Sequence, residues 1–160
     1  ILINADLSGS NLYEANLQGA NLDGAKLRHN NAYKTNFLNA ILTNADFTNA
    51  NLDNTDLSGA NFEGADLTGV QFRGANLRKA KFENATLTGV KFGWGTDLEG
   101  AKFSEAQIID LRTEDFAGVT RCPSGEKPHE ESVVNEDSRE SCEGKMISAD
   151  TDATGVGGGD

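Results

Sequence analysis

Large apolar side chains recur at every fifth position along the first ninety residues of the chain. Nineteen consecutive positions, from Leu2 to Phe92, follow this step, and 18 of these centres are Leu or Phe. Two residues before each centre, 12 of the 18 positions from 5 to 90 are Ala. Directly before the centre, 12 of 18 are Asn or Asp. The repeated motif is Ala-(Asn/Asp)-(Leu/Phe)-x-x.

A period of five excludes both ordinary regular elements. On an α-helix, five residues advance by about 500°, so the centres would form no stripe. On a straight strand, an odd step would send successive centres to opposite faces. The centres can share one core only if the chain turns once in every repeat. Gly, Asn, Ser and Thr crowd the x-x positions, as turns require, and the Asn or Asp before each centre is expected to point outward.

This motif resembles that of the pentapeptide-repeat family over roughly residues 1–110. The resemblance implies an all-β fold, a right-handed quadrilateral parallel β-solenoid with about 20 residues per coil. In that register Leu7, Leu27, Phe47, Leu67 and Leu87 form one stacked column. We expect the solenoid to occupy residues 1–108, and its narrow interior leaves no room for an ordinary substrate pocket.

The motif is interrupted twice. At Asn30 and Ala32 a polar residue and a small centre replace Ala and Leu, which predicts either a locally loose coil or a bulge that serves a partner. The second interruption inserts one residue near 93–97. The glycines Gly93 and Gly95 suggest a bulge there. The single Trp, Trp94, either folds back over the solenoid wall, which we favour, or anchors a partner, which makes these three residues a candidate contact site.

After the repeats the composition becomes polar. Residues 109–145 are expected to form an irregular cap over the open end of the solenoid, because exposed coil edges invite pairing with another chain. Cys122 and Cys142 are expected to form a disulfide across this cap, since little else would hold the segment. Residues 146–160 read as a flexible linker or tail. A disulfide indicates an oxidising compartment, so we expect a periplasmic, thylakoid-lumenal or extracellular protein that is part of an exported or longer chain.

The charge and the side-chain chemistry narrow the function. The chain has 14 basic and 25 acidic residues, a net charge of −11, which argues against nucleic-acid binding. No apolar run is long enough for a transmembrane helix. We find no catalytic constellation, no metal site and no cofactor motif, and therefore expect no enzyme. Asp6, Asp46 and Asp66 share one outer column, where stacked carboxylates could raise each other's pKa; a plain solvated face is the simpler interpretation.

Two functions follow from these observations. The first is a non-enzymatic structural or protein-interaction scaffold with an unknown protein partner, present as a monomer or in weak end-to-end association. The alternative, which the family resemblance implies, is a DNA-mimicking inhibitor or protector of a type II topoisomerase (gyrase), because an acidic rod can imitate duplex charge.

Overall fold

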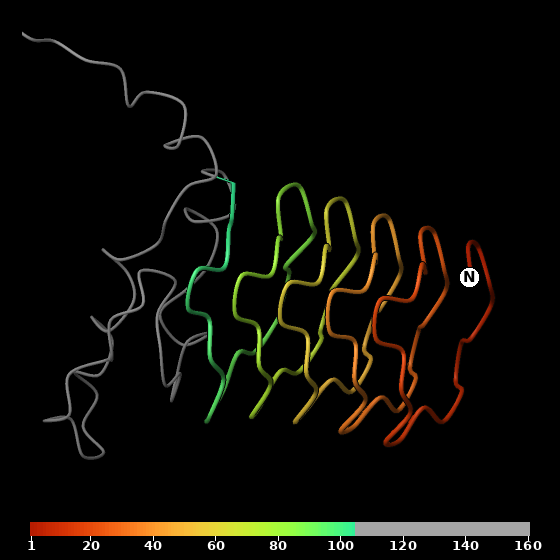
Figure 1. Ribbon diagram of the computed structural model, residues 1–160, viewed down its shortest axis with the longest axis horizontal. Coiled ribbons are helices and arrows are strands. Elements are labelled where there is room, and N and C mark those ends of the chain that lie inside the picture. Colours follow the sequence, from red (N-terminus) through yellow and green to blue (C-terminus); the bar gives the residue numbers. More distant parts are fainter. Residues whose placement is uncertain (105–160) are drawn as a thin grey trace, which may run out of the picture.

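The computed structural model describes residues 1–104, which wind into a rod of stacked coils (Figure 1). Parallel bridges join residues 20 apart, from Asp6 with Lys26 to Gln71 with Lys91. The predicted coil of 20 residues is confirmed. Each N–H or C=O that faces along the rod can therefore pair with the coil above or below, and the Leu2-to-Phe92 pattern becomes a set of straight columns.

Four turns give each coil its four sides. From Leu2 to Leu87, in every turn except the one at Leu52, the C=O of the centre accepts the N–H of the third residue after it, as at Leu57 and Ala60 (3.0 Å). The second x residue has a positive φ in every repeat from Asn4 to Gly89. This combination is that of a type II turn, which requires a left-handed residue at its third position. The predicted corner at the x-x pair is confirmed.

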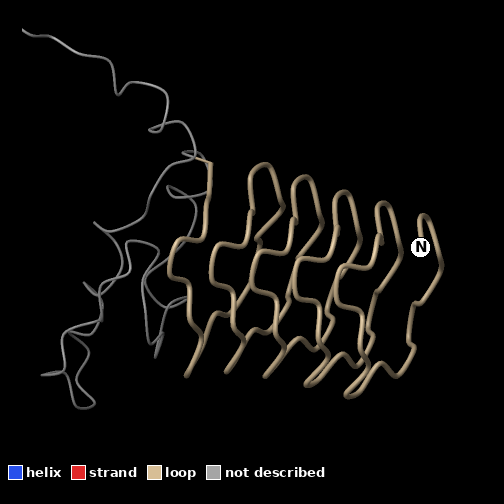
Figure 2. Cartoon of the chain, in the orientation of Figure 1, coloured by secondary structure: helices blue, strands red, loops and turns tan. Residues whose placement is uncertain are grey.

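The legs between the turns are too short to form strands. Figure 2 draws every described residue as loop or turn, and the ladder consists of isolated bridges within residues 1–104. Each leg offers a single bridging residue to its neighbouring coil, because the chain turns again within five residues. The all-β expectation is therefore confirmed in its parallel pairing, but the described residues form isolated bridges and no strands.

The core consists of the centres and the small residues two positions before them. From Leu22 to Phe82, every centre is fully buried. The Phe rings stack along two columns that face each other: the ring centroids of Phe62 and Phe82 lie 5.2 Å apart, and those of Phe72 and Phe92 lie 5.6 Å apart. Between the columns the rings meet edge to face, as Phe62 and Phe72 do at 6.3 Å. Both arrangements are preferred by aromatic pairs.

The first interruption leaves the coil intact. Asn31 forms bridges with Asn11 on one side and Asn51 on the other, so the backbone runs through without a bulge. The bulge expected as one alternative at this position is absent. Asn30 instead turns its side chain into the core, where it is only 2% exposed.

The second interruption is an inserted residue, as predicted. After Lys91 the bridges join residues 21 apart, from Asn76 to Asp97 and from Lys81 to Lys102. The N–H of Gly74 now bonds to the C=O of Trp94 (2.7 Å). The extra residue is therefore absorbed within one corner, and the columns resume at Leu98.

Several predictions fall outside the described residues. These are the last four residues of the expected solenoid, the cap over 109–145 with its Cys122–Cys142 disulfide, and the tail over 146–160.

Candidate functional site

The Asn and Asp residues before each centre bind the backbone of the following turn. The side-chain oxygen of Asn61 accepts the N–H of Glu63 at 3.1 Å, and Asp56 does the same with Ser58. The bond recurs at thirteen positions: Asp6, Asn11, Asn16, Asn21, Asn31, Asn36, Asp46, Asn51, Asp56, Asn61, Asp66, Asn76 and Asp97. Such local bonds are typical of Asx turns. The outward direction was predicted, and this structural role was missed.

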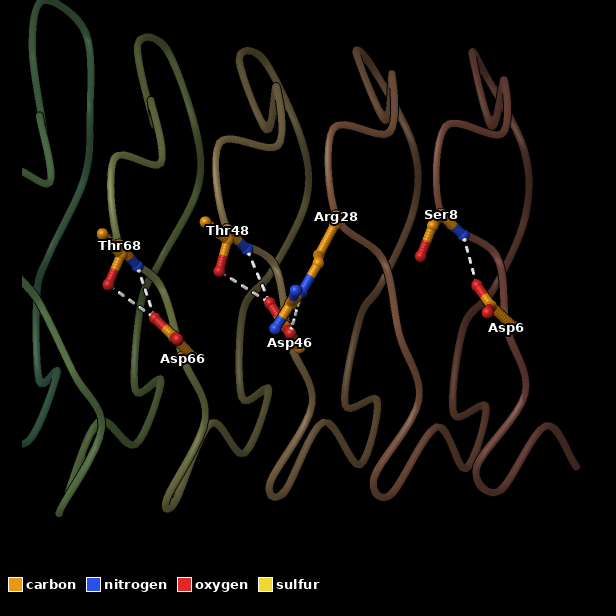
Figure 3. A network of polar contacts seen from close by, with 7 residues as sticks. All are labelled: Asp6, Ser8, Arg28, Asp46, Thr48, Asp66 and Thr68. Carbon is orange, nitrogen blue, oxygen red and sulfur yellow. Dashed lines mark hydrogen bonds and ion pairs between the residues drawn. The ribbon is translucent and has the colours of Figure 1, made fainter.

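One wall carries a regular polar network, which Figure 3 shows from close by. Asp46 accepts bonds from the N–H and the hydroxyl of Thr48, at 3.1 and 2.7 Å, and it pairs with Arg28 from the preceding coil. Asp66 repeats the arrangement with Thr68, at 3.0 and 2.6 Å. Both carboxylates are therefore hydrogen-bonded within their own turns, and Asp46 is also paired with a residue of the neighbouring coil.

The pKa values of Asp6 and Asp46 in this column are both lowered. The hydrogen bonds from Ser8 lower the pKa of Asp6. Partial burial acts to raise the pKa of Asp46, but hydrogen bonds from Thr48 and Arg28 outweigh it, and the pKa is lowered. The backbone of Lys26 forms β-bridges with both Asp6 and Asp46, so a lysine lies between the two carboxylates in the column. The alternative of mutually raised pKa values is therefore wrong for Asp6 and Asp46.

The bulge presents Trp94 to solvent. Its side chain is 72% exposed, so the interpretation that it folds back over the wall is wrong. Gly95 has a φ of 81°, and a Cβ there would lie 3.3 Å from the Cα of Gly74. Directly after the bulge Thr96 returns to the core, and its hydroxyl donates to the C=O of Phe92 and to that of Phe72. Trp94 is thus held on a loop that is fixed at its C-terminal end.

Two further aromatic residues outside the core of residues 1–104 lie on the same corner. Tyr13 and Tyr33 are one coil apart, with parallel rings and centroids 5.9 Å apart. Lys34 lies 6.0 and 5.6 Å from these two ring centroids and pairs with Glu14 at 3.5 Å. The 20-residue coil continues this line through Asp53 and Arg73 to the bulge. We call Tyr13, Tyr33, Asp53, Arg73 and Trp94 the aromatic corner.

The aromatic corner contains every Tyr and the only Trp of the chain, while the core uses Phe and Leu. Tyr13 is 47% exposed. Charge interactions with Tyr13 first and Glu14 second raise the pKa of Lys34. Tyr, Trp and Arg are the residues enriched at the energetic centres of protein interfaces.

The rod is electrically asymmetric. Residues 1–70 contain 3 basic and 8 acidic side chains, whereas residues 71–104 contain 6 basic and 3 acidic ones. Trp94 and Arg73 lie in the basic part. Within residues 1–104 the acidic excess is therefore confined to the N-terminal coils.

The described part of the chain lacks two kinds of feature. Residues 1–104 hold no group of three or more His, Cys, Asp or Glu side chains that could bind a metal ion. In the same range, no helix is long and apolar enough to cross a membrane. The features that remain are the walls, the aromatic corner and the ends of the rod.

These features define a β-solenoid repeat protein. The sequence matches the family of pentapeptide repeats, in eight copies, over residues 1–28, 20–59 and 55–93. The chain belongs to the pentapeptide-repeat family, whose fold is the right-handed β-solenoid expected from the motif. A search of curated proteins found no match.

Three solved structures illustrate the likeness. A pentapeptide repeat protein from the thylakoid lumen of Arabidopsis thaliana is 27% identical over 76% of this chain and 79% of its own, with a TM-score of 0.37. Rfr23 from the cyanobacterium Cyanothece 51142 is 36% identical over 53% and 60%, with a TM-score of 0.33. QnrB1, a plasmid-mediated fluoroquinolone resistance protein, is 23% identical over 63% and 61%, with a TM-score of 0.29. The chain spans less than two thirds of the latter two proteins.

Proposed function

We propose that the protein is a non-enzymatic scaffold that binds a protein partner through its aromatic corner. The observation that carries this proposal is the indole of Trp94, 72% exposed on a bulge whose Thr96 anchor is buried. A large apolar side chain held in solvent costs free energy unless another surface covers it. A corner is convex, so the partner supplies the pocket and Trp94 enters it.

The charge around the bulge specifies the partner further. Residues 71–104 carry twice as many basic as acidic side chains, and Arg73 is exposed beside the bulge. A complementary partner surface has an apolar pocket with an acidic rim, because opposite potentials speed encounter and disfavour wrong partners. The N-terminal coils, which are acidic, would repel such a rim and so fix the direction of binding along the rod.

A photo-crosslinking amino acid at position 94 tests the contact in an extract of the source cells. We expect one adduct that unmodified chain competes away and that the Trp94→Ala variant does not. Glu63 is the control, since it is exposed and lies half a coil away in register, on the opposite corner. Equal labelling from both positions, or equal competition by both chains, would reject the aromatic corner as the contact site.

The alternative function, protection or inhibition of a type II topoisomerase by DNA mimicry, draws support only from the acidic residues 1–70. The basic excess over residues 71–104 runs against it, because a duplex mimic needs one sign of charge along its length. In a gyrase supercoiling assay the protein is expected to change neither the rate of the enzyme nor its response to a fluoroquinolone. A stoichiometric effect in that assay would favour the alternative.

We further propose an oxidising compartment for the protein. The support is the pair Cys122 and Cys142 in a polar segment outside the described residues. Mass spectrometry of native protein after alkylation is expected to find no modified cysteine without a reductant and two with it. Two alkylated thiols in the unreduced sample would remove the argument for export.

Self-association through the N-terminal end of the rod is expected to be weak or absent. The centres of the first coil are only partly buried, and Ile1 and Ile3 are 98% and 48% exposed. A stable dimer interface buries about 800 Å² per partner, and the large hydrophobic side chains exposed at this end are Ile1 and Ile3. Sedimentation velocity over a concentration series should therefore show a monomer, with dimer appearing only at high concentration and diminished by Ile3→Glu.

A further inference from the structure

The core of the second coil contains polar groups with no partner. The side chain of Asn30 is 2% exposed, and neither its Oδ1 nor its Nδ2 has a hydrogen-bond partner among the residues that the structure describes. The Oγ of Ser10, one coil before it in the same column, is also buried without a partner. Buried polar groups in this condition cost free energy unless something satisfies them.

Other polar residues in the core are satisfied by the backbone. The hydroxyl of Thr35 donates to the C=O of Leu12 at 2.6 Å, and that of Thr55 donates to the C=O of Leu52 at 2.6 Å. A buried hydroxyl in this fold can therefore reach a carbonyl oxygen. Asn30 and Ser10 differ from this rule, and they differ together, in adjacent coils of one column.

The same coil has a smaller centre beside these groups. Ala32 is the one centre between Leu2 and Phe92 that is neither Leu nor Phe. It lies two residues after Asn30, so the two side chains point to the same interior. Its column neighbours are Leu12 and Leu52, and the substitution of Leu by Ala removes three carbon atoms from the layer between them.

We propose that a buried water molecule binds at this position and bridges Ser10 Oγ to the side-chain amide of Asn30. Three unpartnered polar atoms match the two to four contacts that a buried water makes. Adjacent coils are separated by roughly 4.8 Å, a gap that one bridging water can span. Ala32 provides the room. The sequence change at Asn30 and Ala32, which disturbs no backbone pairing, is then a paired adaptation: a polar ligand and the space for a water.

Nuclear magnetic resonance tests the water directly in the unmodified chain. We expect a cross-relaxation signal of the long-lived type between bulk-exchanging water and the side-chain amide protons of Asn30. The amide of Asn61, whose Oδ1 bonds to its own turn on the outer wall, serves as the control and should show only short-lived contacts. If Asn30 shows no long-lived water contact, the proposal is overturned.

A double-mutant cycle tests the paired adaptation. Ala32→Leu should displace the water and leave the amide of Asn30 without a partner. The equilibrium constant for unfolding should therefore rise. Asn30→Val should be accommodated, since Val70 and Val90 are fully buried in the same column. The equilibrium constant for unfolding of the double variant is expected to be about tenfold smaller than additivity of the single variants predicts.

The outcome is decisive in either direction. Stabilisation by Ala32→Leu alone, or additive single effects, would mean a dry void beside an unsatisfied amide and would overturn the proposal. If Ala32→Leu does not fold alone, recovery of folding in the double variant supports the coupling, and failure of both leaves the water contact at Asn30 in the unmodified chain to decide.

Discussion

Asn and Asp precede the centres because their side chains accept the first free N–H of the turn that follows. Asn61 and Asp56 make this bond equally well, so the charge of the carboxylate is secondary to its shape. A Lys at this position, such as Lys81, has no side-chain oxygen that could accept this N–H. The backbone of Lys81 still forms a β-bridge to the next coil. The residue type therefore stabilises the turn, and the backbone ladder alone maintains the register.

Asn61→Ala is expected to destabilise the protein by about 0.5–1.5 kcal/mol, the net contribution of a typical hydrogen bond. Urea unfolding measures the difference. The matched control is Lys81→Ala, one coil further in the same column, where little change is expected. A control loss as large as that of Asn61→Ala would contradict the role of the side-chain bond.

The lowered pKa of Asp46 makes part of the stability depend on pH. Because hydrogen bonds from Thr48 and Arg28 favour the carboxylate in the folded chain, the unfolded state binds a proton first as the pH falls. This contribution is present above the unfolded pKa of about 3.9 and is lost as the pH falls through the lower folded value. Asp46→Asn should flatten the decline of stability below about pH 4. An unchanged acid slope would contradict the assignment.

At the scale of the element, the turn was predictable from composition and its detail was not. Gly, Asn, Ser and Thr at the x-x positions indicate corners, and the structure confirms them. Nothing in the spacing reveals that every second x residue needs a left-handed backbone, because Glu14, His29, Lys34 and Lys79 also adopt it. These residues pay a steric cost of roughly 1–2 kcal/mol that a single motif does not display.

Lys79→Gly should therefore stabilise the protein by about 0.5–1 kcal/mol, the relief of strain less the added freedom of Gly in the unfolded chain. Asn84→Gly is the control with a similar φ, 59° against 57°, and should change little, because Asn tolerates this conformation. The free energy of unfolding from denaturant titration measures both. Destabilisation by Lys79→Gly would contradict the strain.

The bulge shows a second limit of the sequence. The inserted residue was readable from the six-residue step between Phe92 and Leu98. The orientation of Trp94 was not, since it depends on Thr96, whose buried hydroxyl bonds to carbonyls of two coils. The aromatic corner was also missed, although the 20-residue register places Tyr13 and Tyr33 in line with the bulge and could have revealed it.

For the whole molecule, stability comes from a sum of coils in which each contacts only its neighbours. The central coils are sealed on both sides, whereas the centres of the first coil are only partly buried. The charge is also distributed by coil, acidic first and basic later. A scaffold of this design presents different chemistry at different heights, which suits recognition along its length.

Leu57→Asp should abolish cooperative folding, because a lone carboxylate would enter a fully buried position at a cost of several kcal/mol (~3 or more). Circular dichroism and thermal melting measure the loss. Ser58→Asp, at the neighbouring partly exposed corner position, is the control and should fold. A cooperative melt for Leu57→Asp would contradict burial at the shared axis.

The winding of the backbone stacks residues that are 20 apart in the sequence. Ring-to-ring nuclear Overhauser effects in a chain with labelled Phe test this stacking most directly. The ring centroids of Phe62 and Phe82 lie 5.2 Å apart, and those of Phe72 and Phe92 lie 5.6 Å apart. The fold predicts cross-peaks within both pairs. Their absence, with contacts only between residues three or four apart, would contradict the solenoid.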